Sequence, residues 1–316
     1  MKTSTDRAWI VLVALLLAGP AAGAEPQQAV RDGGAPGPPV PQASATAPAT
    51  GSERPDDAAG TEAPAPAAAQ ADDDQEAFNP AQPDFTVVNL PTTLRLPPWK
   101  MNFRLSHRFA RPLDDGDFGD LVSDLFGFDS AAIVGLELKI GLWQGFHAGI
   151  YRTNDKTIEF TGQYNLLRQG TNGPVSVDAL AAVDGTDNFS DSYSPALGAV
   201  VSRTIGQTAA IYATPMWVNN SNALPSEVVD DNDTFLLGLA ARVRIRPSVY
   251  LVAEVTPRLA GYDPGDTLAT FGIERRAGRH IFQLNVSNSI GTAFSQVARG
   301  GGGDWYIGFN LSRKFY

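Results

Sequence analysis

The sequence predicts an all-β protein: a transmembrane, antiparallel, up-and-down β-barrel of twelve strands, preceded by a disordered Pro/Ala-rich tail. Three observations lead to this fold class. Apolar and polar residues alternate in segments of about ten residues from Trp99 to the C-terminus. The connections between these segments alternate between long and short, and acidic residues gather in the long ones. Because both chain ends then fall on one side of the membrane, the strand count is even, within a range of 10 to 14.

The first segment, 99–109, sets the pattern. Its apolar phase includes Met101, Phe103 and Leu105, and its polar phase includes Lys100 and Arg104. The same alternation recurs clearly in segments 132–142, 157–166, 234–245 and 304–316, and more weakly in 146–152, 174–183, 195–205, 207–218, 248–259, 267–276 and 279–290. A period of two over this length is typical of strands with one apolar and one polar face.

Charge indicates which face is the interior. Over residues 85–316, the six long or modest connections together with Asp304 hold 17 of the 22 acidic residues and only three basic ones. The other five acids all fall on the polar phase of their strands. A Lys or Arg facing lipid at mid-membrane costs about 2 to 4 kcal/mol. The polar phase is therefore predicted to face the lumen, and the acidic connections to lie outside the cell.

The lumen-lining candidates are the charged residues of this polar phase. They are Lys100, Arg104, Arg108, Glu137, Lys139, Glu159, Asp178, Arg242, Arg244, Glu254, Arg258 and Glu274. Lys100, Arg104 and Arg108 are spaced to form a basic ladder along the first strand. Glu137 with Lys139, and Glu254 with Arg258, are expected to form ion pairs in a wet lumen rather than acid/base catalytic pairs.

The N-terminus predicts export. Residues 1–24 carry Lys2 and Arg7, a short apolar stretch and a small-residue cleavage pattern, as in a signal peptide. Residues 25–84 are rich in Pro, Ala and Asp and lack the apolar content to fold, so we interpret them as a spacer before a barrel domain at 85–316. The expected location is the bacterial outer membrane. The spacer is either a plain linker or a tether to a periplasmic or cell-wall partner.

Composition excludes several function classes. The formal charge is −10 and the chain has no Cys, which excludes disulfides, thiol catalysis and Cys-based metal sites. An acidic chain is a poor partner for nucleic acid. The acidic runs at 114–120 and 230–233 lack the spacing of a calcium-binding EF-hand loop, so we expect no metal and no cofactor. Outer-membrane lipid is an expected contact, beside the possible periplasmic or cell-wall partner of residues 25–84, and the oligomeric state is left open.

Two further segments bear on function. Residues 118–128 have apolar residues at helical spacing, which predicts a short amphipathic helix either on the barrel rim or folded into the pore. Residues 300–303 are all glycine and are expected to form a flexible tip. Ser106 and His107 are the closest approach to a serine–histidine pair, but adjacent strand residues point to opposite faces. No catalytic residue is therefore predicted.

Several segments resemble a known family. Residues 101–109 (MNFRLSHRF), 125–129 (LFGFD), 149–152 (GIYR) and 164–169 (YNLLRQ) are similar to signposts of a family of bacterial β-barrel proteins catalogued as a domain of unknown function. The resemblance covers roughly residues 85–316. It implies an outer-membrane barrel and brings no catalytic or binding residues with it.

The leading functional hypothesis is a narrow, porin-like channel or carrier for small polar solutes, with a mild anion preference set by Lys100, Arg104 and Arg108. Twelve strands lie between the eight that side chains fill and the sixteen that leave an open channel, so either an open or a plugged pore is compatible. The alternative is a structural or anchoring barrel whose tail binds a periplasmic partner. A lipid-modifying enzyme is disfavoured, and a soluble β-sandwich is the structural alternative.

Overall fold

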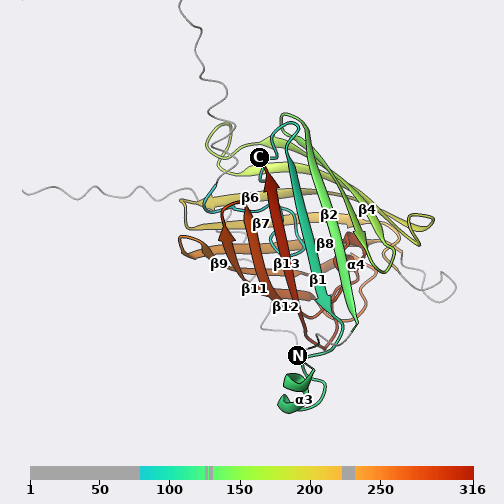
Figure 1. Ribbon diagram of the computed structural model, residues 1–316. Coiled ribbons are helices and arrows are strands. Elements are labelled where there is room, and N and C mark those ends of the chain that lie inside the picture. The colour runs from blue at the N-terminus through green and yellow to red at the C-terminus, as the bar shows by residue number, and fades with distance from the viewer. Residues whose placement is uncertain (1–78, 125–126, 128–130, 223–231) are drawn as a thin grey trace, which may run out of the picture. The chain divides into compact units, whose positions relative to one another are not determined.

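The computed structural model describes residues 79–124, 127, 131–222 and 232–316, and the predicted signal peptide and most of the predicted spacer lie outside this range. The sheet consists of thirteen strand segments (Figure 1). These are β1 (Met101–Phe109), β2 (Ala132–Trp143), β3 (Phe146–Thr153), β4 (Ile158–Leu167), β5 (Ser176–Thr186), β6 (Asp191–Ile205), β7 (Ala209–Val218), β8 (Thr234–Arg246), β9 (Val249–Thr256), β10 (Arg258–Gly261), β11 (Leu268–Ala277), β12 (His280–Ser287) and β13 (Tyr306–Phe315).

The sheet closes on itself. Neighbouring strands pair antiparallel in chain order, and β1 pairs with β13 from Met101 opposite Phe315 to Arg108 opposite Gly308. Segments β9 and β10 form one strand interrupted at Pro257, which has no N–H to donate, and both pair with β8. Thirteen segments therefore make a closed antiparallel barrel of twelve strands, as the sequence predicts.

The two faces of the barrel follow the predicted phases. In β2, Leu136 and Leu138 are exposed on the outside while Glu137 and Lys139 are buried. The exposed outer face is apolar around the barrel and includes Leu136, Leu138, Ile150, Phe160, Tyr164, Leu197, Val243, Leu251, Phe271, Ile273, Phe282 and Leu284. An apolar band outside and charged side chains inside is the arrangement of barrels that span membranes.

The two short helices have opposite environments. Helix α3 (Phe118–Ser123) is capped by Asp117, whose side chain accepts a hydrogen bond from the amide of Asp120, and none of the helix residues is buried. It therefore lies outside the lumen and does not fold into the pore, the second of the two places considered for residues 118–128. Residues 125, 126 and 128 lie outside the described residues. Helix α4 (Phe294–Ala298), in the last long connection, is almost entirely buried.

The glycines after α4 are held in place rather than forming a flexible tip. The backbone of Gly301 both donates to and accepts from the backbone of Asp266, at 2.9 Å in each direction. Gly300 has a φ of +82°, a conformation that glycine adopts without strain. The last connection therefore folds back into the barrel instead of extending from it.

Residues 79–98 run inside the barrel without regular secondary structure (cyan in Figure 1). Two isolated bridges, Asn79 with Gln82 and Thr86 with Pro91, shape the segment. Val87, Val88 and Leu90 are buried against inward-facing side chains of β7, β8 and β9, namely Ala210, Tyr212, Ala240 and Val252. The part of the predicted spacer that the structure describes, residues 79–84, thus packs with the barrel.

Among the residues that the structure describes, no helix is both long and apolar enough to cross a membrane.

The outward phase predicts the effect of a charge at mid-barrel. Leu138 lies opposite Phe103 on β1 and Ile150 on β3, and its side chain is 41% exposed on the outer face. Leu138→Arg places a guanidinium in lipid and should lower the free energy of unfolding by about 2 to 4 kcal/mol. Urea unfolding in liposomes measures it. The control Val122→Arg, on exposed helix α3, should change stability little, and equal effects of both variants would contradict the outward assignment.

Candidate functional site

The interior of the barrel is organised around a hairpin formed by residues 84–94, which we call the lumen hairpin. Its two arms are joined by backbone hydrogen bonds from Thr92 N to Phe85 O (2.9 Å) and from Val87 N to Leu90 O (2.8 Å). Val88 and Asn89 therefore occupy the tip of a tight turn. The turn leaves the tip amides pointing away from the hairpin, where they need partners from the barrel wall.

Glu254 on β9 supplies those partners. Its carboxylate accepts hydrogen bonds from the amides of Val88 (2.6 Å), Asn89 (2.9 and 3.0 Å to its two oxygens) and Leu90 (2.9 Å). Glu254 is 1% exposed. Burying a carboxylate is costly unless hydrogen bonds compensate it, and successive backbone amides at a turn provide that compensation. The hairpin tip and Glu254 therefore depend on each other.

Other wall residues bind the carbonyl groups of the hairpin. Arg104 donates to Val88 O (2.8 Å) and Arg242 donates to Thr86 O (2.9 Å). Side-chain amides add three contacts of the same kind: Gln283 to Val87 O (2.6 Å), Asn310 to Val88 O (3.2 Å) and Gln163 to Thr92 O (2.7 Å). The wall thus recognises mainly the backbone of the hairpin.

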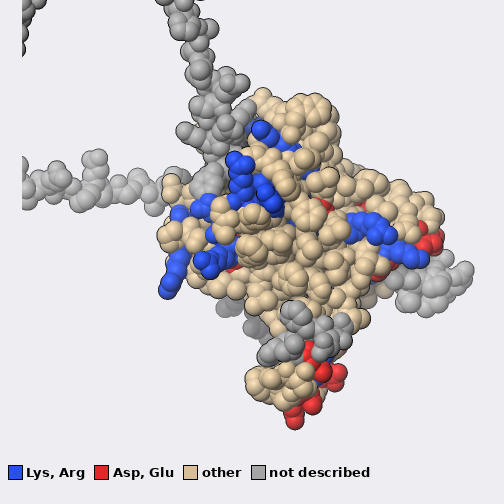
Figure 2. All heavy atoms as spheres, in the orientation of Figure 1, with Lys and Arg blue, Asp and Glu red and all other residues tan. Residues whose placement is uncertain are grey.

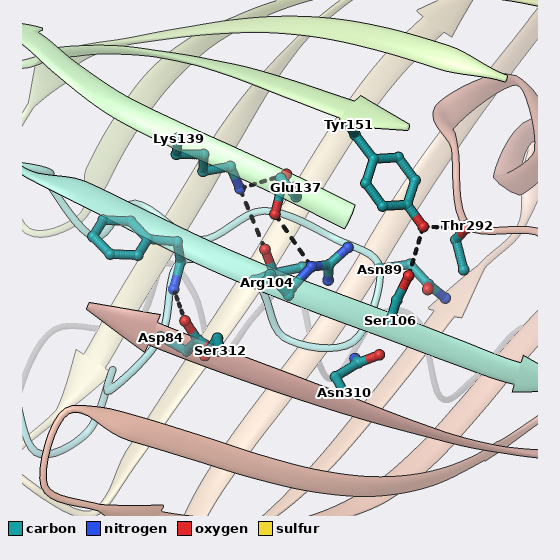
Figure 3. Close-up of polar contacts among 12 residues, drawn as sticks. Asp84, Asn89, Arg104, Ser106, Glu137, Lys139, Tyr151, Thr292, Asn310 and Ser312 are labelled. Atoms are coloured by element: carbon teal, nitrogen blue, oxygen red, sulfur yellow. Dashed lines mark hydrogen bonds and ion pairs between the residues drawn. The ribbon is translucent and has the colours of Figure 1, made fainter. Parts of the chain in front are cut away.

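Side-chain contacts add to these backbone contacts, among them Thr93 with Ser202 on β6 (2.5 Å). Arg108 donates to the side-chain oxygen of Asn89 (3.1 Å), and Lys139 donates to the hydroxyl of Thr86 (3.3 Å). At the base of the hairpin, Ser312 donates to the carboxylate of Asp84 (2.6 Å). Figure 3 shows Lys139 and Ser312 of the wall beside Asp84 and Asn89 of the hairpin.

Ion pairs connect the wall residues to one another. Glu137 lies between Arg104 (3.2 Å) and Lys139 (3.1 Å), as drawn in Figure 3, so the expected pairing of Glu137 with Lys139 is present and includes Arg104 as well. Arg242 pairs with Glu274 (3.0 Å), and both side chains are fully buried. These pairs hold the guanidinium groups beside the hairpin: Arg104 is ion-paired with Glu137 while it donates to Val88 O, and Arg242 donates both to Glu274 and to Thr86 O.

The remaining candidates lie at the two ends of the barrel. Lys100 precedes β1 and is half-buried. Arg244 donates to Pro247 O (3.1 and 3.2 Å) in the turn after β8. Arg258 pairs with Asp263 and donates to Asp266 O (3.0 Å) in the connection after β10. Glu254 and Arg258, expected to pair, therefore bind different partners, because Pro257 breaks the strand between them.

Helix α4 fills the lumen beyond the hairpin tip. Phe294 and Ala298 pack against inward-facing Leu180, Val200, Met216 and Leu236. Two wall carboxylates bind the start of the helix: Glu159 accepts from Phe294 N (2.7 Å) and Asp184 accepts from Ser295 N (3.0 Å). Asp178, by comparison, accepts hydrogen bonds from the wall amides of Gln163 (2.6 Å) and Asn165 (2.7 Å).

Little space remains between the hairpin and the wall. A cavity of about 20 Å³ lies beside Arg104, Glu137, Tyr151 and Glu159, which is room for about one water molecule. A wider cavity of about 350 Å³ opens at the end of the barrel where the short turns lie, and its lining includes Asn79, Arg95 and Arg168. The interior is therefore a mouth leading to a filled centre.

Ser106 and His107, the closest approach to a serine–histidine pair in the sequence, are not arranged for catalysis. Ser106 lies inside, where its hydroxyl hydrogen-bonds that of Tyr151 at 2.6 Å, as Figure 3 shows. The ring of His107 stacks on Phe309 on the outside, with centroids 4.8 Å apart. Within the described part of the chain, no group of three or more His, Cys, Asp or Glu residues is placed to hold a metal ion.

Sequence reasoning missed the lumen hairpin and its uncharged partners. The sequence candidates are charged residues only, whereas Gln163, Gln283 and Asn310 contact the hairpin as directly as the arginines do. One signal was present: Phe85, Val87, Val88 and Leu90 form an apolar cluster immediately after a polar spacer, and an apolar cluster ahead of the first strand needs a place to be buried.

Removing the Glu254 carboxylate should loosen the hairpin tip. Glu254→Gln keeps the size of the side chain but loses the charge that binds the amides, at a cost of roughly 1.5 to 3 kcal/mol for a charged hydrogen-bond partner. Amide hydrogen exchange at Val88–Leu90 should then accelerate by roughly 10- to 100-fold. Asp184→Asn, which acts on α4, is the matched control. Exchange unchanged by Glu254→Gln, or accelerated equally by both variants, would contradict the assignment.

Solved structures with a related arrangement include porins and channels. The NanC porin is 9% identical, with 68% of this chain and 100% of that chain covered and a TM-score of 0.46. The KdgM porin is 7% identical (69% and 99% covered, TM-score 0.44), and the COG4313 outer membrane channel from Pseudomonas putida F1 is 10% identical (70% and 97% covered, TM-score 0.44). No curated protein matches the chain significantly.

Family membership follows from the sequence match. Residues 84–315 match the family described as "membrane bound beta barrel domain (DUF5777)", and this range contains the lumen hairpin and all thirteen strand segments. The resemblance stated from residues 101–169 is thereby confirmed. The chain belongs to this family of membrane-bound β-barrel domains.

Proposed function

We propose that the chain is an outer-membrane barrel that passes small polar solutes and that the lumen hairpin closes it. The observation that carries this proposal is the chemistry of the wall. Its buried arginines, glutamates and amides bind backbone N–H and C=O groups of the hairpin. Water or a polar solute can make the same hydrogen bonds, so the wall stays solvated when the hairpin leaves.

Charge balance argues against a strong ion preference. The buried basic residues of the wall are Arg104, Arg108, Lys139, Arg242 and Lys314, and the buried acidic ones are Glu137, Glu159, Asp178, Asp184, Glu254 and Glu274. Five positive charges face six negative ones, and Arg104 is already paired with Glu137. The mild anion preference inferred from Lys100, Arg104 and Arg108 is therefore not part of the proposal.

The filled lumen also favours a second candidate, a structural barrel that anchors a tail. The cavity beside Arg104 admits about one water molecule, which is what a permanently closed barrel requires. The tail would then act on a periplasmic or cell-wall partner through residues 25–78, the part of the predicted spacer that precedes the packed residues 79–84. The two candidates differ in whether the barrel conducts once the hairpin is removed.

Planar-bilayer recording separates them. The chain lacking residues 79–96 should conduct, because the wall charges then face water instead of the hairpin, and the currents should grow when the connection 289–303 is also shortened, since α4 fills the other half of the lumen. The intact chain should give no sustained current.

Heat-modifiable migration on gels verifies that each shortened barrel has folded. A folded barrel that lacks both fillings and still carries no current would contradict the channel and leave the anchoring barrel as the better account. In that case, deletion of residues 25–78 should abolish co-purification of the partner without affecting folding.

A further inference from the structure

A groove runs along the outer face of the barrel over β9, β11, β12 and β13. Its volume is about 540 Å³, within the range of small-molecule sites. The outward side chains that line it are apolar apart from Arg275: Val249, Ile273, Phe282, Leu284, Phe309 and Leu311. Cross-strand pairing brings them together, with Ile273 opposite Leu284 and Phe282 opposite Leu311. The groove therefore offers a continuous apolar surface along the strands.

One end of the groove is basic. Arg275 lines the groove and lies opposite both Val249 and Phe282, while Arg313 lies two residues beyond Leu311 and opposite His280. Both arginines are exposed, and the guanidinium of Arg313 lies 5.0 Å from the ring centroid of Phe315. Arg279, in the turn between β11 and β12, is exposed nearby. Figure 2 shows Lys and Arg side chains gathered over this part of the barrel.

Within the described strands β9, β11, β12 and β13, no acidic side chain lies on this outer face. The acids within β9, β11, β12 and β13 are Glu254 and Glu274, and both are buried inside the barrel. The basic end is the end of the short turns, which in such barrels faces the periplasm. It therefore lies at the height of the inner-leaflet headgroups.

We infer that this groove is a binding site for an anionic glycerophospholipid of the inner leaflet, with an acyl chain along Ile273, Phe282 and Leu311 and the phosphate against Arg275 and Arg313. The apolar length and the basic end match the two parts of such a lipid. Arginine suits the phosphate because its planar guanidinium donates two parallel hydrogen bonds. The inference rests on the membrane barrel and is independent of whether the barrel conducts.

Other outward-facing arginines lack this combination. Arg152 lies at the end of β3 that is farther from the short turns, and it donates to Asn188 (2.9 Å) in a loop. Arg203 lies on β6, opposite Ile211, and is half-buried. Neither residue lines the groove, so these two provide a control that removes the same charge from the same outer surface.

Native mass spectrometry of the full mature chain, purified in detergent and delipidated, tests the site. The probes are phosphatidylglycerol and phosphatidylethanolamine with identical acyl chains. The unsubstituted chain, the parent of the variants below, should retain more phosphatidylglycerol than phosphatidylethanolamine. Arg275→Gln/Arg313→Gln should weaken phosphatidylglycerol binding by about 30-fold and abolish the preference, given the usual contribution of each arginine near an anionic lipid. Arg152→Gln/Arg203→Gln should leave both unchanged.

A second variant tests the groove separately from the charge. Ile273→Trp fills the groove while keeping both arginines, and it should weaken the binding of both lipids. Heat-modifiable migration verifies that every variant folds. Equal retention of the two lipids by the parent would overturn the inference, as would an Arg275→Gln/Arg313→Gln barrel that binds like the parent or an equal loss in the control.

Discussion

The interior depends on one interaction, the carboxylate of Glu254 against the three tip amides of the lumen hairpin. A buried carboxylate needs donors, and a tight turn needs an acceptor for its outward-pointing amides. The carboxylate and the tip amides therefore satisfy each other. Their contact fixes how far the hairpin reaches into the barrel and which wall residues its two arms contact. Arg104 and Arg242 then donate to Val88 O and Thr86 O. Each also has a counter-ion on the wall: Glu137 on β2 for Arg104 and Glu274 on β11 for Arg242.

Backbone recognition links this geometry to function. A wall that bound the hairpin through apolar side chains alone would be left with exposed apolar surface if the hairpin moved. In this barrel the wall side chains that contact the hairpin backbone carry charged or amide groups, which water can satisfy. Apolar contacts with the wall also exist, from Val87, Val88 and Leu90 of the hairpin and from Phe294 and Ala298 of α4. The wall around the hairpin is therefore compatible with a closed state and with a hydrated one. The closed state is built from two segments far apart in the sequence, 79–98 and α4.

Strand positions and their two faces could be predicted because a membrane barrel imposes a period of two, and an error of one residue would place Glu137 or Arg104 in lipid. The residues that pair with those charges could not be predicted from the sequence. Pairing Glu254 with Arg258 assumed a regular strand that Pro257 interrupts. The lumen hairpin carries no period, since its backbone bonds go to side chains from distant strands. Helix α4 is too short, at five residues, to give a helical pattern.

Disulfide trapping tests the central claim, that the lumen hairpin occupies the barrel, most directly. The chain has no Cys, and the hydroxyls of Thr93 on the hairpin and Ser202 on β6 lie 2.5 Å apart. Thr93→Cys/Ser202→Cys should therefore form a disulfide on mild oxidation in membranes, whereas Thr93→Cys/Thr153→Cys, with the second cysteine near the far end of β3, should not. No disulfide in the first pair, or equal formation in both, would contradict the account.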